Sequence, residues 1–254
     1  METADDTLRP NHGRIDFERL PNTRDLGGLE TVDGRRVRPG VLLRSGALFF
    51  ADAADLARLR DDYRLRAVID LRGDEELAEL PDPMDELPRA SYLHADVLKG
   101  AIEGISQDAE SRARLEALRT DTEDPARFME TVYPEILLGP SGLAGYAAFL
   151  RRVLETTDGS VLWHCHVGRD RCGMASMLVE HILGVSMAAI EDDYLATNLY
   201  TDVPSDERTA ANLRFLRAAV RAACARYGSL DGYVREGLGL TEADVAELRG
   251  RYLA

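Results

Sequence analysis

The residues best suited to chemistry lie in one short stretch, residues 161–173, which reads VLWHCHVGRDRCG. It holds Cys165 and Cys172, two of the three cysteines in the chain. An apolar run precedes Cys165, and an apolar helix-forming stretch follows Gly173, so we expect a buried strand, a tight loop and then a helix. Loop amides next to a helix N-terminus form a cradle for anions. The stretch therefore predicts an anion site with a thiol inside it.

Cys165 and Arg171 could together carry out nucleophilic chemistry on a phosphate group. A thiol at a helix N-terminus near arginines ionises well below its free pKa of about 8.5, and the thiolate is the reactive form. The planar guanidinium of Arg171 can fold back over the loop and hold two oxygens of a tetrahedral anion. A nucleophile, a nest of amides and a bidentate arginine are the groups needed to attack phosphorus and hold its oxygens.

The composition limits the classes of partner. The chain has 254 residues, with 31 Lys and Arg against 45 Asp and Glu, and a net charge of −14. This acidic balance argues against nucleic acid and against an anionic membrane surface as partners. The chain has an odd number of cysteines and an acidic N-terminus without an apolar leader, and it has no apolar run near ~18 residues. These features predict a cytoplasmic protein.

The elements that must position the loop follow an α/β pattern. Strands alternate with helices early in the chain and helices dominate later, so we expect one α/β domain over residues 1–254. Residues 65–72, LRAVIDLR, predict a buried strand. Residues 73–90 are acidic and contain three prolines, which predicts a surface excursion. We expect a poorly ordered segment at residues 1–20 and a helical lid or insertion at about residues 99–140.

The Cys-x5-Arg spacing after a strand resembles the phosphate loop of protein tyrosine phosphatases. The longer form, His-Cys-x-x-Gly-Lys/Arg-Asp-Arg, is similar to that of bacterial protein tyrosine/serine phosphatases of the triple-specificity type. Those enzymes also carry Asn-x-Arg-Asp-Leu-Gly-Gly, which stands here as NTRDLGG at residues 22–28. AVIDLR, DDYLATN and YVREGLGLTEADVAELR extend the resemblance over most of the chain. It implies a tyrosine-phosphatase-like fold, with a central, mostly parallel sheet flanked by helices and a helical C-terminal part.

The resemblance also implies a role for individual residues. Cys165 matches the nucleophile that forms a phosphocysteine intermediate, Arg171 the arginine that grips phosphate, and His164 a residue that supports the loop and its thiolate. Asp170, inside the loop, is the first choice as general acid, and Asp96 is the second, because related phosphatases draw this acid from a separate loop. The expected phosphate-binding residues are His166, Val167, Gly168, Arg169, Arg171, Cys172 and Gly173.

Two positions depart from the family pattern. Arg169 replaces a more usual lysine, and Cys172 stands where a serine or threonine normally follows the arginine. A thiol is a weaker donor than a hydroxyl, so slow release of the thiolate is expected. A disulfide between Cys165 and Cys172 is a further hypothesis for reversible protection. Arg24 and Asp25 in NTRDLGG could contact substrate or brace the phosphate loop, and we favour bracing.

Several alternatives stay open at this point. The HCH sequence could supply metal ligands, but neighbouring strand residues point to opposite faces and the chain has no second Cys/His cluster, so we predict neither a metal nor a cofactor. A rhodanese-like sulfur transferase would have a shorter loop and would lack NTRDLGG. The expected substrates are phosphotyrosine or phosphoserine in proteins, or a phosphoinositide, with phosphate, sulfate or vanadate as further ligands of the site. The alternatives are a small metabolite, such as a nucleotide or sugar phosphate, and a pseudophosphatase that binds phosphorylated ligands without turnover.

Overall fold

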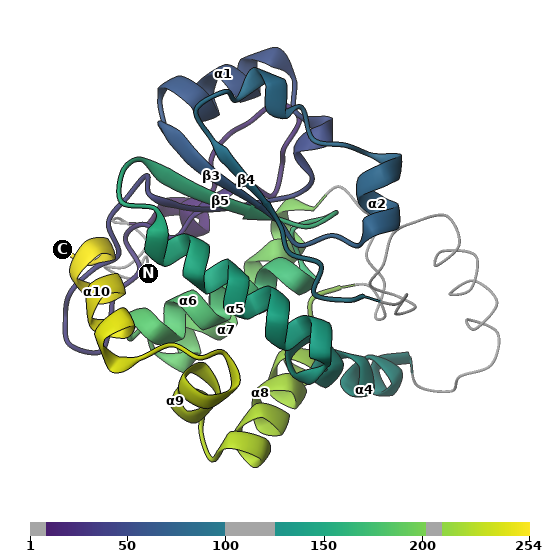
Figure 1. The fold of residues 1–254 in the computed structure, drawn as a ribbon, viewed down its shortest axis with the longest axis vertical. Coiled ribbons are helices and arrows are strands. Elements are labelled where there is room, and N and C mark those ends of the chain that lie inside the picture. Colours follow the sequence, from purple (N-terminus) through teal and green to yellow (C-terminus); the bar gives the residue numbers. More distant parts are fainter. Residues whose placement is uncertain (1–8, 100–124, 202–209) are drawn as a thin grey trace.

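The computed structural model describes residues 9–99, 125–201 and 210–254 (Figure 1). The first half contains the strands and short helices η1 (Pro10–Gly13), β1 (Arg24–Asp25), β2 (Leu42–Ser45), η2 (Leu48–Phe50), α1 (Ala53–Asp61), β3 (Leu65–Asp70), α2 (Asp74–Glu79), η3 (Met84–Glu86) and β4 (Ser91–His94). The second half contains α4 (Pro125–Leu138), α5 (Pro140–Glu155), β5 (Ser160–His164), α6 (Asp170–Leu183), α7 (Met187–Tyr200), α8 (Leu213–Tyr227), α9 (Leu230–Gly232), η4 (Tyr233–Gly237) and α10 (Glu242–Tyr252).

The five strands form one sheet in the order β1-β2-β5-β3-β4. β5 pairs in parallel with β2 and β3, β3 pairs in parallel with β4, and β1 is antiparallel to β2. The mostly parallel sheet confirms the predicted fold class. The register places Ser45, His164, Asp70 and His94 in one row across the carboxyl ends of four strands. Ligands of parallel α/β sheets bind at this edge, so the polar loop after β5 lies where a site is expected.

Helices cover both faces of the sheet (Figure 1). α1 lies on one side, above a small core cluster that contains Leu43, Val68 and Leu162. α5, α6 and α7 lie on the other side, over the larger cluster. The ring of Trp163 is fully buried in that cluster, 5.4 Å from the Phe149 ring centroid. β5 is therefore buried on both faces, as its continuous apolar sequence predicts.

Two segments differ from the sequence-based expectations. Residues 15–20 were expected in a poorly ordered segment, but Phe17 and Leu20 belong to the small core cluster because their apolar side chains pack beneath α1; residues 1–8 lie outside the described residues. Residues 73–90 are not simply a surface excursion, because Glu76 and the side chain of Asp82 are buried.

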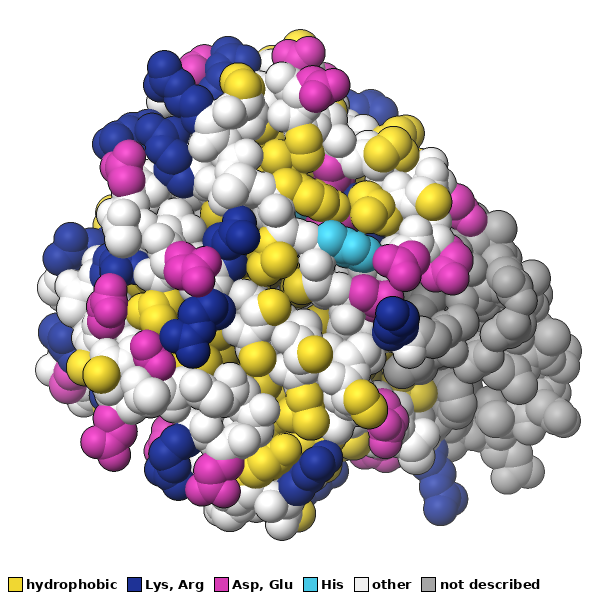
Figure 2. All heavy atoms as spheres, in the orientation of Figure 1, with side chains coloured by type: hydrophobic (Ala, Val, Ile, Leu, Met, Phe, Trp, Pro, Cys, Tyr) yellow, Lys and Arg dark blue, Asp and Glu magenta, His cyan; other side chains and the backbone are white. Residues whose placement is uncertain are grey.

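The expected lid at residues 99–140 lies partly outside the described residues, since 100–124 are not described. Its last part is α4, which packs against α8 and α5. None of the described helices is both long and apolar enough to cross a membrane. On the face shown in Figure 2, acidic and basic side chains are interspersed with apolar ones, as is usual at the surface of a globular domain.

Candidate active site

The loop of residues 165–169 joins the end of β5 to the start of α6, and donors from outside the loop fix its backbone. Asn22 Nδ2 donates to the carbonyl oxygens of Val167 and Gly168, at 3.0 and 3.2 Å. Arg44 Nη2 also donates to Gly168 O, at 2.9 Å, and the amide of Ala47 donates to His166 O, at 2.9 Å. Gly168 has φ = +77°, and a Cβ there would lie 2.6 Å from a backbone oxygen, so only glycine fits.

Cys165 follows the last residue of β5, and its side chain is buried at the mouth of this loop. Burial alone raises the pKa of a thiol, but hydrogen bonds from the side chain and amide of Cys172 and the charge of Arg171 act in the opposite direction and are stronger together. The net effect lowers the pKa of Cys165 from 9.0 to about 5. The sulfur is therefore a thiolate at neutral pH, which is the form that acts as a nucleophile.

Cys172 is fully buried on the first turn of α6, and its pKa is raised by burial and by the neighbouring Cys165. It therefore keeps its proton. Two acceptors lie within reach of that proton, the Cys165 sulfur and the carbonyl oxygen of Ser45, which is 3.6 Å from Cys172 Sγ. Hydrogen bonds to an ionised acceptor are about twice as strong as neutral ones, so the thiolate is the preferred acceptor.

Arg171 is buried and held end-on by a carboxylate that the sequence analysis missed. Its two terminal nitrogens donate to the two oxygens of Glu76, with Nη2 to Oε1 at 2.9 Å and a shorter contact from Nη1 to Oε2. Glu76 also accepts from the amide of Gly73 at the start of α2, at 3.0 Å. This pair uses the end of the guanidinium and not Nε, so it fixes the direction of the side chain beside Cys165. An acidic helix after strand β3 was the only signal in the sequence.

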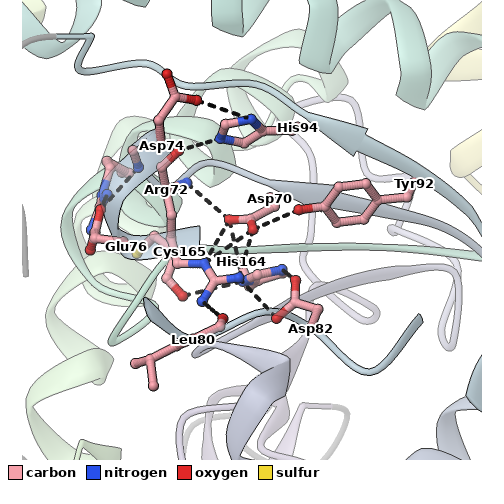
Figure 3. Close-up of polar contacts among 12 residues, drawn as sticks. Asp70, Arg72, Asp74, Glu76, Leu80, Asp82, Tyr92, His94, His164 and Cys165 are labelled. Carbon is pink, nitrogen blue, oxygen red and sulfur yellow. Dashed lines mark hydrogen bonds and ion pairs between the residues drawn. The ribbon is translucent and has the colours of Figure 1, made fainter. Parts of the chain in front are cut away.

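His164 lies behind the loop in a buried network of charges (Figure 3). Its Nε2 lies 2.8 Å from Asp82 Oδ2, and its Nδ1 lies 3.2 Å from the carbonyl oxygen of Cys165. Burial lowers the pKa of this imidazole, but Asp82 and Asp70 more than offset that effect, so its pKa is raised. Arg72 pairs with both carboxylates, at 2.7 Å to Asp70 and 3.0 Å to Asp82. Tyr92 OH donates to Asp70 at 2.9 Å, which completes the network.

Asp70, Asp82 and His164 offer three ligand atoms within 4.8 Å of one another, a group that could in principle hold a metal ion. The guanidinium of Arg72 already supplies a cation to both carboxylates, and His164 carries a raised pKa. Metal binding requires a neutral imidazole, and an ion here would also meet the charge of Arg72. The donor set therefore fits ion pairing better than a metal.

The two acid candidates lie in different surroundings. Asp170 accepts a short hydrogen bond from Tyr133 OH of α4, and its two carboxylate oxygens lie 3.1 and 3.2 Å from Arg169 Nε. Asp96 lies in the loop after β4, where its Oδ1 accepts from the amide of Leu98 at 2.7 Å. Burial raises the pKa of Asp96, and Asp74 raises it further, although Leu98, His94 and Arg171 act in the opposite direction.

The residues of NTRDLGG lie behind the loop. Arg24 is fully buried and pairs with Asp193 of α7, at 2.9 Å, and Arg44 pairs with the other oxygen of the same carboxylate, at 2.7 Å. Because Arg44 also binds Gly168 O, Arg24 is linked to the loop indirectly, through Asp193 and Arg44. Asp25 accepts from the amides of Gly27 and Gly40, at 2.8 and 2.6 Å. The direct contacts come from Asn22 and Arg44, which the sequence analysis did not single out.

The guanidinium of Arg169, one of the expected phosphate-binding residues, lies against Asp170. Its Nη1 is buried and has no hydrogen-bond partner among the described residues. Three more of the expected phosphate-binding residues lie on the loop or at the start of α6. His166 and Val167 are half-buried on the loop, and Gly173 is buried on α6 against the ring of Tyr194.

Comparison with known proteins extends over nearly the whole chain. The model of the tyrosine phosphatase family matches residues 15–254. A Cupriavidus necator protein assigned to the tyrosine-protein phosphatases is 34% identical over 267 residues, which cover 95% of this chain and 90% of that protein. The triple specificity protein phosphatase PtpB of Mycobacterium tuberculosis is 27% identical, over 90% of this chain and 95% of its own. A tyrosine-protein phosphatase of Nostoc commune is 26% identical, over 84% and 80%. These matches confirm the resemblance found in the sequence, and the chain belongs to the tyrosine phosphatase family and is a phosphatase.

Proposed function

We propose that the chain hydrolyses phosphate monoesters by double displacement at Cys165. The observation that carries this proposal is the lowered pKa of Cys165, about 5, in a loop beside the fixed guanidinium of Arg171. In the first step the thiolate attacks phosphorus, a P–S bond forms, and the bond from phosphorus to the ester oxygen breaks. In the second step water attacks the phosphocysteine and passes a proton to the carboxylate that acted as the acid in the first step. The P–S bond breaks, and inorganic phosphate leaves with the thiolate restored.

We further propose Asp96 as the acid that protonates the leaving oxygen in the first step. The raised pKa of Asp96 favours the protonated form that a general acid needs. Asp170 is a weaker choice, because both its oxygens face Arg169 and one of them already accepts from Tyr133. Asp170 then positions the loop, and Nη1 of Arg169 is available to a phosphate oxygen.

The role proposed for Cys172 is to donate a hydrogen bond to the Cys165 sulfur, and so to stabilise the departing thiolate, as the phosphocysteine breaks down. The Cys172 contact to the thiolate supports this role, and the second acceptor, Ser45 O, can accept the hydrogen bond of Cys172 while the Cys165 sulfur is phosphorylated. A thiol donor is weaker than the usual hydroxyl, so the second step is expected to be slow. Active hydrolysis is favoured over a pseudophosphatase because the nucleophile is already ionised.

For the substrate we propose phosphotyrosine or phosphoserine in proteins, or a phosphoinositide. The names of the relatives, tyrosine-protein phosphatases and a triple-specificity phosphatase, support this class. A small metabolite such as a nucleotide or sugar phosphate remains the second candidate. A reducing compartment such as the cytoplasm suits an enzyme that depends on a free thiolate.

The test is hydrolysis of p-nitrophenyl phosphate with EDTA present. Wild type should turn over, Cys165→Ser should bind vanadate without turnover, and Cys224→Ser, on the half-buried cysteine of α8, should behave as wild type. Full activity of Cys165→Ser would reject the mechanism. Vanadate binding by wild type without turnover of any phosphorylated substrate would instead establish a pseudophosphatase.

The choice of acid is tested with two leaving groups. Loss of a general acid matters most when the leaving oxygen is basic, so Asp96→Asn should lose far more activity on phenyl phosphate than on p-nitrophenyl phosphate. The activity of Asp170→Asn should fall by a similar factor on both substrates. The opposite pattern would give the acid role to Asp170.

A further inference from the structure

A pocket of about 310 Å³ lies beside the phosphate loop, at the carboxyl end of β2. Its inner wall is formed by His166 and Val167 of the loop itself. The opposite walls come from the loop before β1 and the segment after β2. These two segments line the pocket with Glu18, Arg19, Pro21, Ala47 and Phe50.

The walls of this pocket are held in place before any ligand binds. The amides of Glu18 and Arg19 donate to the two oxygens of Asp55, a carboxylate buried on α1, at 3.0 and 2.9 Å. On the other side Asn22 binds the carbonyl oxygens of the phosphate loop, and the amide of Ala47 binds His166 O. A pocket fixed on both sides costs little to order when a ligand enters.

The chemistry of the pocket is aromatic and nearly neutral. Phe50 is 43% exposed, which is unusual for a large apolar side chain, and its ring stands edge-on to the His166 ring with centroids 5.8 Å apart. Pro21 and Ala47 add apolar wall. The side chains of Glu18 and Arg19 bring one charge of each sign and make no hydrogen bond or ion pair with the described residues. Opposite charges at the rim do not favour a second phosphate, whereas the aromatic wall favours an apolar group.

We propose that this pocket is a specificity subsite for an apolar or aromatic side chain of a phosphopeptide, located near the phosphorylated residue. The inference rests on the proposed function, since the phosphate must occupy the loop that forms the inner wall. A peptide presents further side chains at about 3.3–3.6 Å per residue, which brings a near neighbour into reach. A phosphoinositide headgroup or a sugar phosphate presents mainly hydroxyl and phosphate groups there and offers far less apolar surface to the Phe50 ring than a leucine or phenylalanine side chain does.

The test compares kcat/KM for phosphotyrosine peptides that differ only in their flanking residues. One set carries leucine or phenylalanine at one to three residues from the phosphotyrosine, and the other set carries alanine at all of these positions. Burial of one such side chain corresponds to roughly a 10- to 100-fold preference of wild type for the best leucine or phenylalanine peptide. Phe50→Ala should abolish most of this preference. Phe49→Ala is the matched control, because Phe49 is equally exposed at 43% but does not line the pocket.

The outcomes separate this inference from the proposed function. If wild type hydrolyses p-nitrophenyl phosphate but has no flanking preference, or if Phe50→Ala keeps the preference, the subsite is wrong while the function stands. If Phe50→Ala lowers activity equally on p-nitrophenyl phosphate and on all peptides, the pocket takes the phosphotyrosine ring itself and the inference fails. A preference for a second phosphate or a nucleotide base that Arg19→Ala or Phe50→Ala removes would also overturn it. No hydrolysis of any substrate would instead reject the function.

Discussion

Removal of the Cys172 thiol should raise the pKa of the Cys165 nucleophile by a predictable amount. In Cys172→Ala the amide of residue 172 and the charge of Arg171 remain, and only the side-chain hydrogen bond to the thiolate is lost. A hydrogen bond to a charged group is worth about 1.5–3 kcal/mol, and one pKa unit corresponds to about 1.4 kcal/mol. The pKa of Cys165 should therefore rise from about 5 by about one to two units.

The assay is the rate of alkylation by iodoacetamide as a function of pH, followed by mass spectrometry of the peptide that carries Cys165. Wild type should reach half its maximal rate near the pKa of about 5, and Cys172→Ala about one to two units higher, with similar rates at pH 8. Cys172 should stay unmodified, because its pKa is raised and its side chain is buried. Cys172→Ser is the matched control, since a hydroxyl can still donate.

An unchanged midpoint in Cys172→Ala, with the melting temperature close to that of wild type, would refute this reasoning. It would mean that Arg171 and the backbone amide alone set the pKa of Cys165. If the midpoint is raised in Cys172→Ser as well, the packing of the Cys172 sulfur, rather than its proton, is what lowers the pKa of Cys165.

Two further predictions concern the carboxylates behind the loop. Glu76→Gln keeps the hydrogen bond to the start of α2 but removes the charge that directs Arg171. The value of kcat/KM should therefore fall about tenfold or more, while the rate of Cys165 alkylation at pH 8 changes little. Unchanged kinetics would leave Glu76 a purely structural role. Because the pKa of His164 is raised in the folded chain, its pair with Asp82 stabilises fully below pH ~6.5 and is lost as pH rises through the raised pKa. Asp82→Asn should therefore lower the melting temperature more at pH 6 than at pH 9. The control is Asp74→Asn, on an exposed carboxylate, which should change the melting temperature little at either pH. An equal fall in melting temperature at both pH values for Asp82→Asn would contradict the pairing.

Local patterns were enough to predict the centre of this site. An apolar strand, a loop with a glycine and an apolar helix predicted the path of residues 160–183, and the structure has β5, the loop and α6 there. The mostly parallel sheet was also predicted, because the strand and helix patterns and the family motifs agree. The path of residues 160–183 depends on neighbours in the sequence. The parallel sheet was implied by the family resemblance, since β5 pairs with β2 and β3, which lie far from it in the chain.

The partners of the loop could not be predicted in the same way. Glu76 meets Arg171 across 95 residues, and Arg44 meets Gly168 across 124. Acidic residues in a proline-rich segment are usually solvated, so nothing local marks Asp82 as the buried partner of His164. Only the fold brings these charges together, and burial then gives them their effect on the pKa values.

The most direct test of the central claim is to trap the phosphorylated protein. Wild type mixed rapidly with a phosphotyrosine peptide carrying labelled phosphate, and quenched in denaturant within the first turnover, should hold label on the peptide that contains Cys165. Cys172→Ala should hold the label longer, and Cys165→Ser should form no phosphocysteine. Turnover without any label on the chain, or with label on another residue, would contradict a phosphocysteine intermediate at Cys165.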